Sequence, residues 1–236
     1  MPWEDNINQL EDEIQAREDF VAAFAHELKT PLTSIIGYAD ALRSRRLDEE
    51  KQFMSANYIY TEGKRLEAMS FRLLDIMVTR RGEVEFTMVS AESLFLYLYD
   101  MYVINKSMKI YFNYDDGMVR AEANLIKSVL MNLLDNAFKA SEADGLIEVY
   151  GHLMKDGYCF EVKDHGVGIP KEELHKITKA FYMVDKSRSR SRNGAGLGLA
   201  LCAEILELHK SRLNIRSELG GTTMSFTLPL WKEDQL

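Results

Sequence analysis

The chain has 236 residues, of which 46% are hydrophobic and 28% charged, and its formal net charge at pH 7 is −8. This composition is typical of a soluble globular protein, and the acidic balance argues against a general nucleic-acid binder, whose contacts to phosphates need a basic surface. No run approaches the ~18 apolar residues of a membrane-spanning helix, and no signal peptide opens the sequence, so we expect no membrane contact by this part of the protein. The two cysteines, Cys159 and Cys202, lie in apolar segments and predict buried free thiols.

The first eighty residues carry the pattern of two long helices. A heptad seam with one polar member, Arg17, runs from the N-terminus, and helical spacing continues past Pro31, which predicts a kink, to about Ser44. A short turn at 44–48 leads to a second amphipathic helix that ends near Arg80. Two such helices cannot bury both seams alone, so the pattern predicts a homodimer built as a four-helix bundle. The apolar positions are Trp3, Ile7, Leu10, Ile14, Val21, Phe24 and Leu28, then Ile59, Leu66, Met69, Leu73 and Ile76.

After residue 82 the pattern changes to mixed strands and helices. Alternation over 84–88 predicts a half-buried strand, Ser90 can cap a helix running to about Asn105, and Asp156-Gly157 suits a hairpin turn. Such mixed elements predict a sheet covered by helices in a separate α/β domain. Further strands are expected near 109–114, 118–121, 146–153, 158–163, 213–217 and 222–230, with helices near 123–141 and 197–209.

A histidine lies on the outer side of the first helix. With Val21 and Leu28 at heptad position a, His26 falls at f, the most exposed position. Neutral imidazole is a competent nucleophile near pH 7, and Glu27 beside it can orient the ring and accept its proton. Thr30 lies one turn on, where a zinc protease would need a second histidine, so that class is excluded. An ordinary surface histidine is the alternative.

Two asparagines and a lysine share one face of the helix expected at 123–141. With about 100° per residue, Asn132, Asn136 and Lys139 fall within about 60° of one another, opposite an apolar side. Asparagine is a poor helix former, and neither asparagine sits at a cap. Amide oxygens suit Mg²⁺ and lysine suits phosphate, which indicates a nucleotide site, with a solvated face as the alternative.

Two glycine motifs suit a nucleotide. The segment 164–170, Asp-His-Gly-Val-Gly-Ile-Pro, follows a predicted strand; its glycines allow close backbone approach, and Asp164 can accept a hydrogen bond from the adenine amine, which would select ATP over GTP. The segment 194–199, Gly-Ala-Gly-Leu-Gly-Leu, opens a helix, where backbone amides can hold phosphates. Neither a dinucleotide fingerprint, a P-loop lysine nor a His-Arg-Asp catalytic loop occurs in the sequence. A plain strand-ending turn is the alternative for the first motif.

Between these motifs lie Phe181-Tyr182 and the basic run 186–192, Lys-Ser-Arg-Ser-Arg-Ser-Arg. The run is either a solvated loop or a mobile lid that closes over a triphosphate.

In this order the motifs resemble the sensor histidine kinases of two-component systems. The segment 24–33, Phe-Ala-His-Glu-Leu-Lys-Thr-Pro-Leu-Thr, is similar to their phosphoacceptor box, and the resemblance covers nearly all of residues 20–230. It implies a multidomain fold, α then α+β, in which a helical hairpin forms a dimeric four-helix bundle and is followed by a two-layer α/β sandwich of the Bergerat type that binds ATP. The implied domains are a signalling helix extension at 1–19, a dimerisation and histidine phosphotransfer domain at 20–81, and a catalytic ATP-binding domain at 83–236.

The resemblance also implies the reaction and its residues. His26 would receive the γ-phosphoryl group of Mg·ATP and pass it to an aspartate on the receiver domain of a response regulator. Glu27 would serve as base, Thr30 would position water for a reverse phosphatase reaction, and Asn136 would bind Mg²⁺. The residues implied to bind the nucleotide are Asn132, Asn136, Lys139, Asp164, Gly166, Gly168, Phe181, Tyr182, Lys186, Arg188, Gly194, Gly196, Leu197, Gly198 and Thr222.

Two other functions share parts of this pattern. A gyrase-like or chaperone-like ATPase would have the ATP motifs without the His26 box, and a non-catalytic or phosphatase-only dimerising module would not need intact ATP motifs. The resemblance further implies the cytoplasmic portion of a bacterial membrane receptor, in which the heptad from Trp3 enters from an upstream signalling module.

Overall fold

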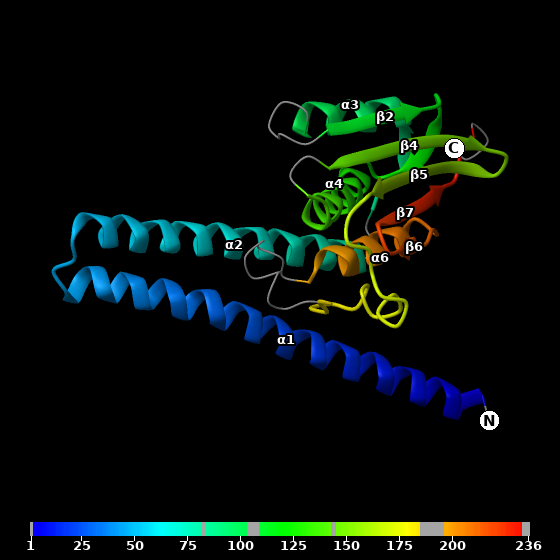
Figure 1. The fold of residues 1–236 in the computed structure, drawn as a ribbon. Coiled ribbons are helices and arrows are strands. Elements are labelled where there is room, and N and C mark those ends of the chain that lie inside the picture. The colour runs from blue at the N-terminus through cyan, green and yellow to red at the C-terminus, as the bar shows by residue number, and fades with distance from the viewer. Residues whose placement is uncertain (1, 82–83, 103–108, 143–144, 185–195, 233–236) are drawn as a thin grey trace. The chain divides into compact units, whose positions relative to one another are not determined.

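The computed structural model describes residues 2–81, 84–102, 109–142, 145–184 and 196–232 (Figure 1). The chain divides into two compact units, Met1–Phe71 and Arg72–Leu236. This division falls within the second helix, whereas the sequence places the domain boundary after that helix, at 81–83. The domain ranges given above therefore stay a prediction.

Two long helices make up the N-terminal part of the chain. α1 spans Pro2–Ser44 and continues through Pro31, and α2 spans Glu49–Arg81. The Lys51 N–H donates to Asp48 Oδ1 at 2.9 Å, which satisfies a free amide in the first turn of α2. The rings of Tyr38 and Tyr58 stack with centroids 4.7 Å apart and join the two helices. Large apolar side chains stay exposed on them: Val21, Leu32, Ile36, Phe53, Met54, Tyr58 and Tyr60.

A mixed five-stranded sheet forms the centre of the C-terminal unit, with the strand order β2-β4-β5-β7-β6. The β2–β4 pair is parallel and the other three pairs are antiparallel. A separate antiparallel pair joins β1 to β3. The strand bounds are β1 Thr87–Ser90, β2 Lys109–Tyr114, β3 Met118–Ala121, β4 Leu146–Met154, β5 Gly157–Asp164, β6 Asn214–Glu218 and β7 Gly221–Leu228.

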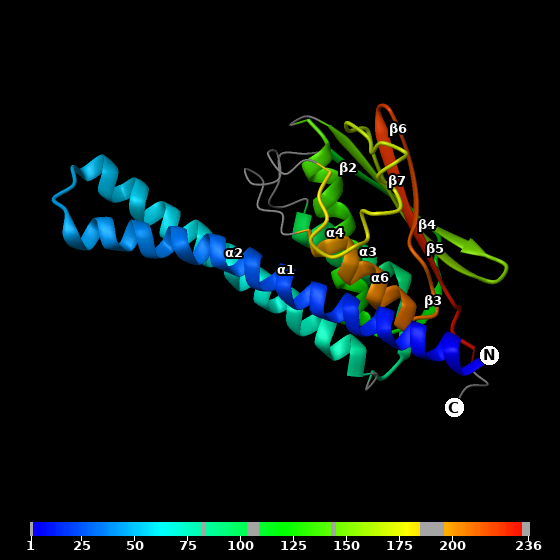
Figure 2. The ribbon, with the colours of Figure 1, turned by 90° about the horizontal axis from the view of Figure 1, so that it is seen from below.

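Helices cover one face of this sheet, as Figure 2 shows for α3 (Ala91–Tyr102), α4 (Ala123–Ala140) and α6 (Gly198–Leu208). Buried and part-exposed residues alternate along β5 and β7, because only one face of each strand packs against the helices. Phe160 of β5 stacks on Phe95 and on Phe226, with centroids 5.7 and 5.1 Å away. Each such buried side chain contributes roughly 1.5–3 kcal/mol to stability.

Most predicted elements are confirmed, with two local corrections. The strand predicted from residue 84 begins only at Thr87, because its partner β3 is four residues long. In the β4–β5 hairpin Met154 pairs with Gly157, so the two turn residues are Lys155 and Asp156. Gly157 instead allows close approach of β7, since a Cβ there would lie 2.7 Å from the Leu228 carbonyl oxygen.

The predicted cap on α3 is also confirmed. The Ser93 N–H lies 3.4 Å from Ser90 Oγ, as expected of a cap on α3. Cys202 is buried as predicted, whereas Cys159 is only half-buried, and among the described residues neither cysteine forms a disulfide. Within the part of the chain that the structure describes, no helix is both long and apolar enough to cross a membrane.

Candidate active site

A cavity of about 200 Å³ lies between α4 and the covered face of the sheet. Five residues predicted from the sequence line it: Asn136, Asp164, Gly168, Tyr182 and Thr222. The rest of the lining is mainly apolar, which suits the flat, weakly polar surface of a nucleobase. These apolar lining residues are Leu133, Ala137, Ala140, Val162, Ile169, Ile177, Val184, Leu199 and Met224.

Asp164 is the last residue of β5 and supplies the buried acid of the cavity, with 5% of its surface exposed. Its Oδ1 accepts the Gly166 N–H at 2.8 Å, and the backbone N–H of Thr222 also donates to this carboxylate. Burial raises the pKa of Asp164, while the two backbone hydrogen bonds lower it in part. An ionised carboxylate has room for about four donors, so Asp164 can still accept one from a ligand.

Close backbone packing shapes the loop after Asp164. A Cβ on Gly166 would lie 2.4 Å from the carbonyl oxygen of Ala140, at the end of α4. Gly168 has a φ of +72°, and a Cβ there would lie 2.1 Å from the Glu218 carbonyl oxygen. Gly166 is therefore needed because a side chain would have no space. Gly168 is needed for the same reason and for its backbone conformation. Packing against Ala140 and Glu218 therefore explains both glycines.

Asn132 and Asn136 have different surroundings although both lie on α4. Asn132 is 7% exposed and donates from Nδ2 to the Ser128 carbonyl oxygen at 2.9 Å. A Cβ on Gly198 of α6 would lie 2.8 Å from Asn132 Oδ1, so only glycine leaves room for this amide. A solvated face is therefore wrong for Asn132, because α6 packs over it, whereas half-buried Asn136 lines the cavity. Lys139, on the last turn of the same helix, is also half-buried.

The residues on either side of the basic run lie together. The Phe181 N–H donates to the Gly196 carbonyl oxygen at 2.9 Å, and both residues have positive φ angles, of 63° and 68°. A Cβ on Gly196 would lie 2.8 Å from Phe181 Cα, so this glycine also permits a close backbone contact. Leu197 is fully buried and offers no side-chain acceptor to the first turn of α6. Lys186, Arg188 and Gly194 lie outside the described residues.

Two residues of the segment predicted to accept phosphate, 24–33, can be described on α1. His26 and Thr30 are both exposed on α1, one turn apart. The Thr30 hydroxyl lies 3.5 Å from the His26 carbonyl oxygen, which is a long contact that leaves it available to other partners. By contrast, Thr33 donates to the Lys29 carbonyl oxygen at 2.8 Å.

Sequence reasoning missed Ser217, which connects the loop after Asp164 to the hairpin formed by β6 and β7. Ser217 of β6 accepts the Ile169 N–H at 2.7 Å and lies 2.9 Å from the Thr222 hydroxyl. It donates to the Gly221 carbonyl oxygen at 3.1 Å. The apolar lining was missed as well, because a period-two pattern shows which face is buried but not which buried residues border a cavity.

Two family models match the chain, each over one of the predicted parts. The "His Kinase A (phospho-acceptor) domain" matches residues 16–77, and the "Histidine kinase-, DNA gyrase B-, and HSP90-like ATPase" matches residues 121–232. The first match includes His26 and separates the chain from ATPases that lack a phosphoacceptor domain.

Relatives and solved structures agree with these matches. The sensor histidine kinase WalK of Bacillus subtilis is 31% identical, over 98% of this chain and 39% of the relative. YclK of the same organism is 30% identical, over 97% of this chain and 51% of the relative, so the chain spans about half or less of these two proteins. The structure of histidine kinase ThkA in complex with response regulator protein TrrA has a similar fold, with a TM-score of 0.74 at 24% identity over 96% of this chain and 67% of that chain.

The two family matches occur in the order in which the sequence places the His26 box and the ATP motifs, and the named relatives share both parts over nearly the whole chain. The chain therefore belongs to the sensor histidine kinases of two-component systems.

Proposed function

We propose that this chain uses ATP to phosphorylate its own His26 and then transfers the phosphoryl group to an aspartate of a response regulator. The observation that carries the proposal is the buried Asp164 carboxylate in the cavity, which keeps acceptor capacity for the amine of adenine. The exposed imidazole of His26 supplies the second half of the reaction. A kinase needs both groups, whereas a dimerising module needs neither.

The lining of the cavity supports binding of the base of a nucleotide. The base would pack between the apolar walls while Asp164 accepts its amine, and Gly168 lets the loop backbone approach it. Asn136 lines the same cavity, and its amide oxygen is a ligand type that Mg²⁺ accepts. When bound, the metal would neutralise the negative charge of the phosphates.

The phosphates would extend toward the start of α6. The uncapped first turn of this helix offers backbone amides beside Gly196 and Gly198, and Asn132 lies against Gly198. Lys139 would add charge from α4. Phe181 and Tyr182 would border the site, and the nucleotide contacts of Lys186, Arg188 and Gly194 stay predictions from the sequence.

In the transfer, one ring nitrogen of neutral His26 attacks the γ-phosphorus. A P–N bond forms, the P–O bond to ADP breaks, and the ring proton passes to Glu27 acting as base. In the second step the P–N bond breaks as an aspartate oxygen of the regulator takes the phosphoryl group. The complex of ThkA with TrrA supports a regulator as partner. The apolar side chains left exposed on α1 and α2 support a homodimer.

Labelling with γ-labelled Mg·ATP tests the product. The phosphoprotein should be stable in alkali and labile in acid, as a phosphoramidate is. His26→Gln should remove the label while ATP binding, measured by calorimetry, stays intact. His175→Gln, at another exposed histidine, serves as the matched control and should keep the label. Undiminished labelling of His26→Gln would contradict the proposal.

A phosphatase activity toward the phosphorylated regulator is the second function that we propose. The weakly bound Thr30 hydroxyl, one turn from His26, can hydrogen-bond a water that attacks the phospho-aspartate. Autophosphorylation needs no such water, so Thr30→Ala should keep most His26 labelling but lose most of the phosphatase activity. Thr33→Ala is the control, because that hydroxyl is bound to the helix backbone. Equal loss of both activities in Thr30→Ala would indicate a disturbed helix instead.

We also propose that the full-length protein is a bacterial membrane receptor and that this part of it works in the cytoplasm. The supports are its membership among the sensor kinases and the share of the relatives' length that it spans. Localisation of a fluorescent fusion to the full-length protein would test this.

A further inference from the structure

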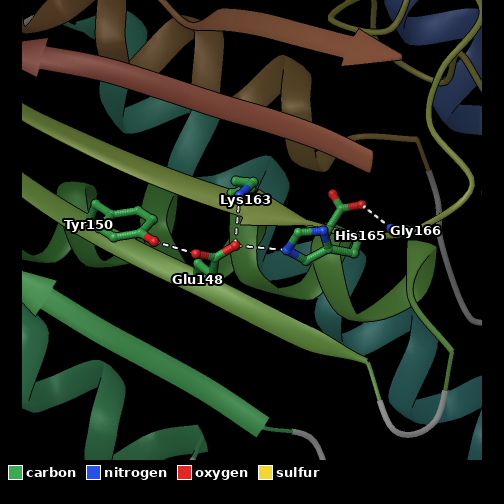
Figure 3. Close-up of polar contacts among 6 residues, drawn as sticks. Glu148, Tyr150, Lys163, His165 and Gly166 are labelled. Carbon is green, nitrogen blue, oxygen red and sulfur yellow. Dashed lines mark hydrogen bonds and ion pairs between the residues drawn. The ribbon is translucent and has the colours of Figure 1, made fainter. Parts of the chain in front are cut away.

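The two residues that flank Asp164 bind one carboxylate on the other face of the sheet. Lys163 Nζ lies 2.8 Å and His165 Nε2 lies 2.7 Å from Oε1 of Glu148, on the neighbouring strand β4 (Figure 3). Side chains alternate along a strand, so Lys163 points away from the cavity that Asp164 lines. The residues before and after Asp164, which is proposed to bind adenine, are thus both bound to Glu148 on the opposite face of the sheet.

Glu148 is itself fixed in place. The Tyr150 hydroxyl donates to Oε2, the oxygen that Lys163 and His165 leave free, and the Glu148 side chain is 14% exposed. Hydrogen bonds from Lys163, then Tyr150 and His165, lower the pKa of Glu148 to about 2. The same contact raises the pKa of Tyr150 to about 12. The carboxylate is therefore ionised and oriented throughout the physiological range.

The contacts of Glu148 lie where the pairing between β4 and β5 ends. Glu148 pairs with Lys163 and Ile147 with Asp164, which is the last pair between β4 and β5. Beyond Asp164 the chain leaves the sheet and enters the glycine loop. The end of a strand tends to fray, and the Glu148 contacts lie on either side of this last paired residue.

We propose that Glu148 is a positioning residue for nucleotide recognition, which fixes the Asp164 carboxylate through Lys163 and His165. The inference rests on the proposed function, in which Asp164 accepts a hydrogen bond from the adenine amine. Hydrogen bonds weaken steeply with angle and distance, so an Asp164 that moves with a loosened strand end loses part of this bond. Guanine offers an acceptor at that place and gains nothing from Asp164. Glu148 therefore supports the preference for ATP over GTP.

This preference separates positioning from a merely structural role. If Glu148 only stabilised the fold, its loss would lower the folded fraction and weaken the binding of both nucleotides equally. If Glu148 positions Asp164, its loss weakens ATP binding and leaves GTP binding nearly unchanged. The ratio of the two dissociation constants is the quantity to measure.

Calorimetry of the full chain with ATP and with GTP tests the proposal. Glu148→Ala should bind ATP roughly three- to tenfold more weakly, the ratio that corresponds to one net hydrogen bond, with GTP affinity unchanged. Glu148→Gln keeps the shape and one acceptor oxygen, so it should fold and show a smaller shift in the same direction. Glu161→Ala, on the same face of β5 and paired with Tyr150, is the matched control and should leave the ratio unchanged.

A double-mutant cycle shows whether Glu148 acts through its partners. His165→Ala should reproduce part of the loss, and Glu148→Ala combined with His165→Ala should cost less than the two separate losses together. Additive losses, or an unchanged ratio in both Glu148 variants, would overturn the inference. Asp164→Ala in the same assay distinguishes a failure of the proposed Asp164 role from a failure of the positioning inference. If that variant retains full ATP affinity, the proposed role of Asp164 fails; if it loses the preference for ATP while the Glu148 variants keep it, only the positioning inference fails.

Discussion

The two units of this protein present their chemistry in opposite ways. The helical part carries His26 and Thr30 as exposed side chains on one helix, spaced by a single turn. The α/β unit assembles its cavity from α4, β5, β7 and the loops around them, with Asp164 buried at the centre. An exposed nucleophile needs access to moving partners, whereas a nucleotide site needs fixed donors and acceptors out of water. One unit is therefore defined by local spacing and the other by long-range packing.

Separating the two units should have the largest effect. We expect residues 1–80 alone to form a helical dimer, because their apolar side chains otherwise stay exposed, and residues 83–236 to be a monomer that binds ATP. Light scattering and calorimetry on the two fragments measure both properties. A monomeric N-terminal fragment would contradict the bundle. ATP binding by 72–236 but not by 83–236 would show that the end of α2 belongs to the ATP-binding unit, where the compact division places it.

A methyl group added to the loop after Asp164 should have the second largest effect. Gly168→Ala would place Cβ 2.1 Å from the Glu218 carbonyl oxygen in a backbone with a φ of +72°. The left-handed conformation costs a non-glycine residue about 1–2 kcal/mol, and the clash adds to that. We expect the α/β unit to lose about 3 kcal/mol of stability and most of its ATP affinity, as measured by urea unfolding and calorimetry. Near-normal ATP binding would show that this loop can move without harm to the site.

A buried histidine links the ends of two helices in the α/β unit. His209 is 3% exposed, and its Nε2 accepts the Glu122 N–H at 3.1 Å at the start of α4. Its Nδ1 lies 2.7 Å from the Ile205 carbonyl oxygen, so Nδ1 carries the proton and the ring is neutral. Burial lowers the pKa of His209, and protonation of Nε2 would set it against a backbone donor.

The stability of the α/β unit should therefore fall in mild acid. The unfolded chain binds a proton at His209 near the ordinary pKa of about 6.5, whereas the folded chain binds it only at lower pH. The contribution of His209 to the free energy of unfolding should be constant above about pH 6.5 and should decrease as the pH falls from there toward the lowered pKa of the folded state. His209→Gln offers an acceptor and a donor without titrating, so it should flatten this part of the pH profile. An equally steep profile in that variant would assign the pH dependence to other groups.

The sequence predicted different things well in the two units. Local spacing was enough to predict that His26 and Thr30 lie one turn apart on an exposed face, because both belong to one continuous helix. In the α/β unit the sequence singled out the turn and loop glycines. It did not give the reason for Gly157, because that residue packs against β7, more than sixty residues later in the chain. Glu148 and Ser217 were missed for the same cause. Their partners are brought together by strand register, which no local pattern encodes.

Gly37 in the helical unit has no structural reason to be glycine, so replacing it should have a small effect. Nothing lies within 4 Å of a Cβ built on Gly37 of α1, where the heptad puts this residue at the exposed position c. Glycine inside a helix costs about 0.5–1 kcal/mol relative to alanine, so Gly37→Ala should stabilise a dimer of residues 1–80 by about that amount for each of its two chains. Urea unfolding followed by circular dichroism measures this change. Gly63→Ala is the companion variant, at a half-buried position of α2 where a Cβ would also have nothing within 4 Å. A loss of stability or of dimerisation in either variant would mean that the glycine contacts a second copy of the chain, and chemistry in the helical unit would then depend on long-range packing as well.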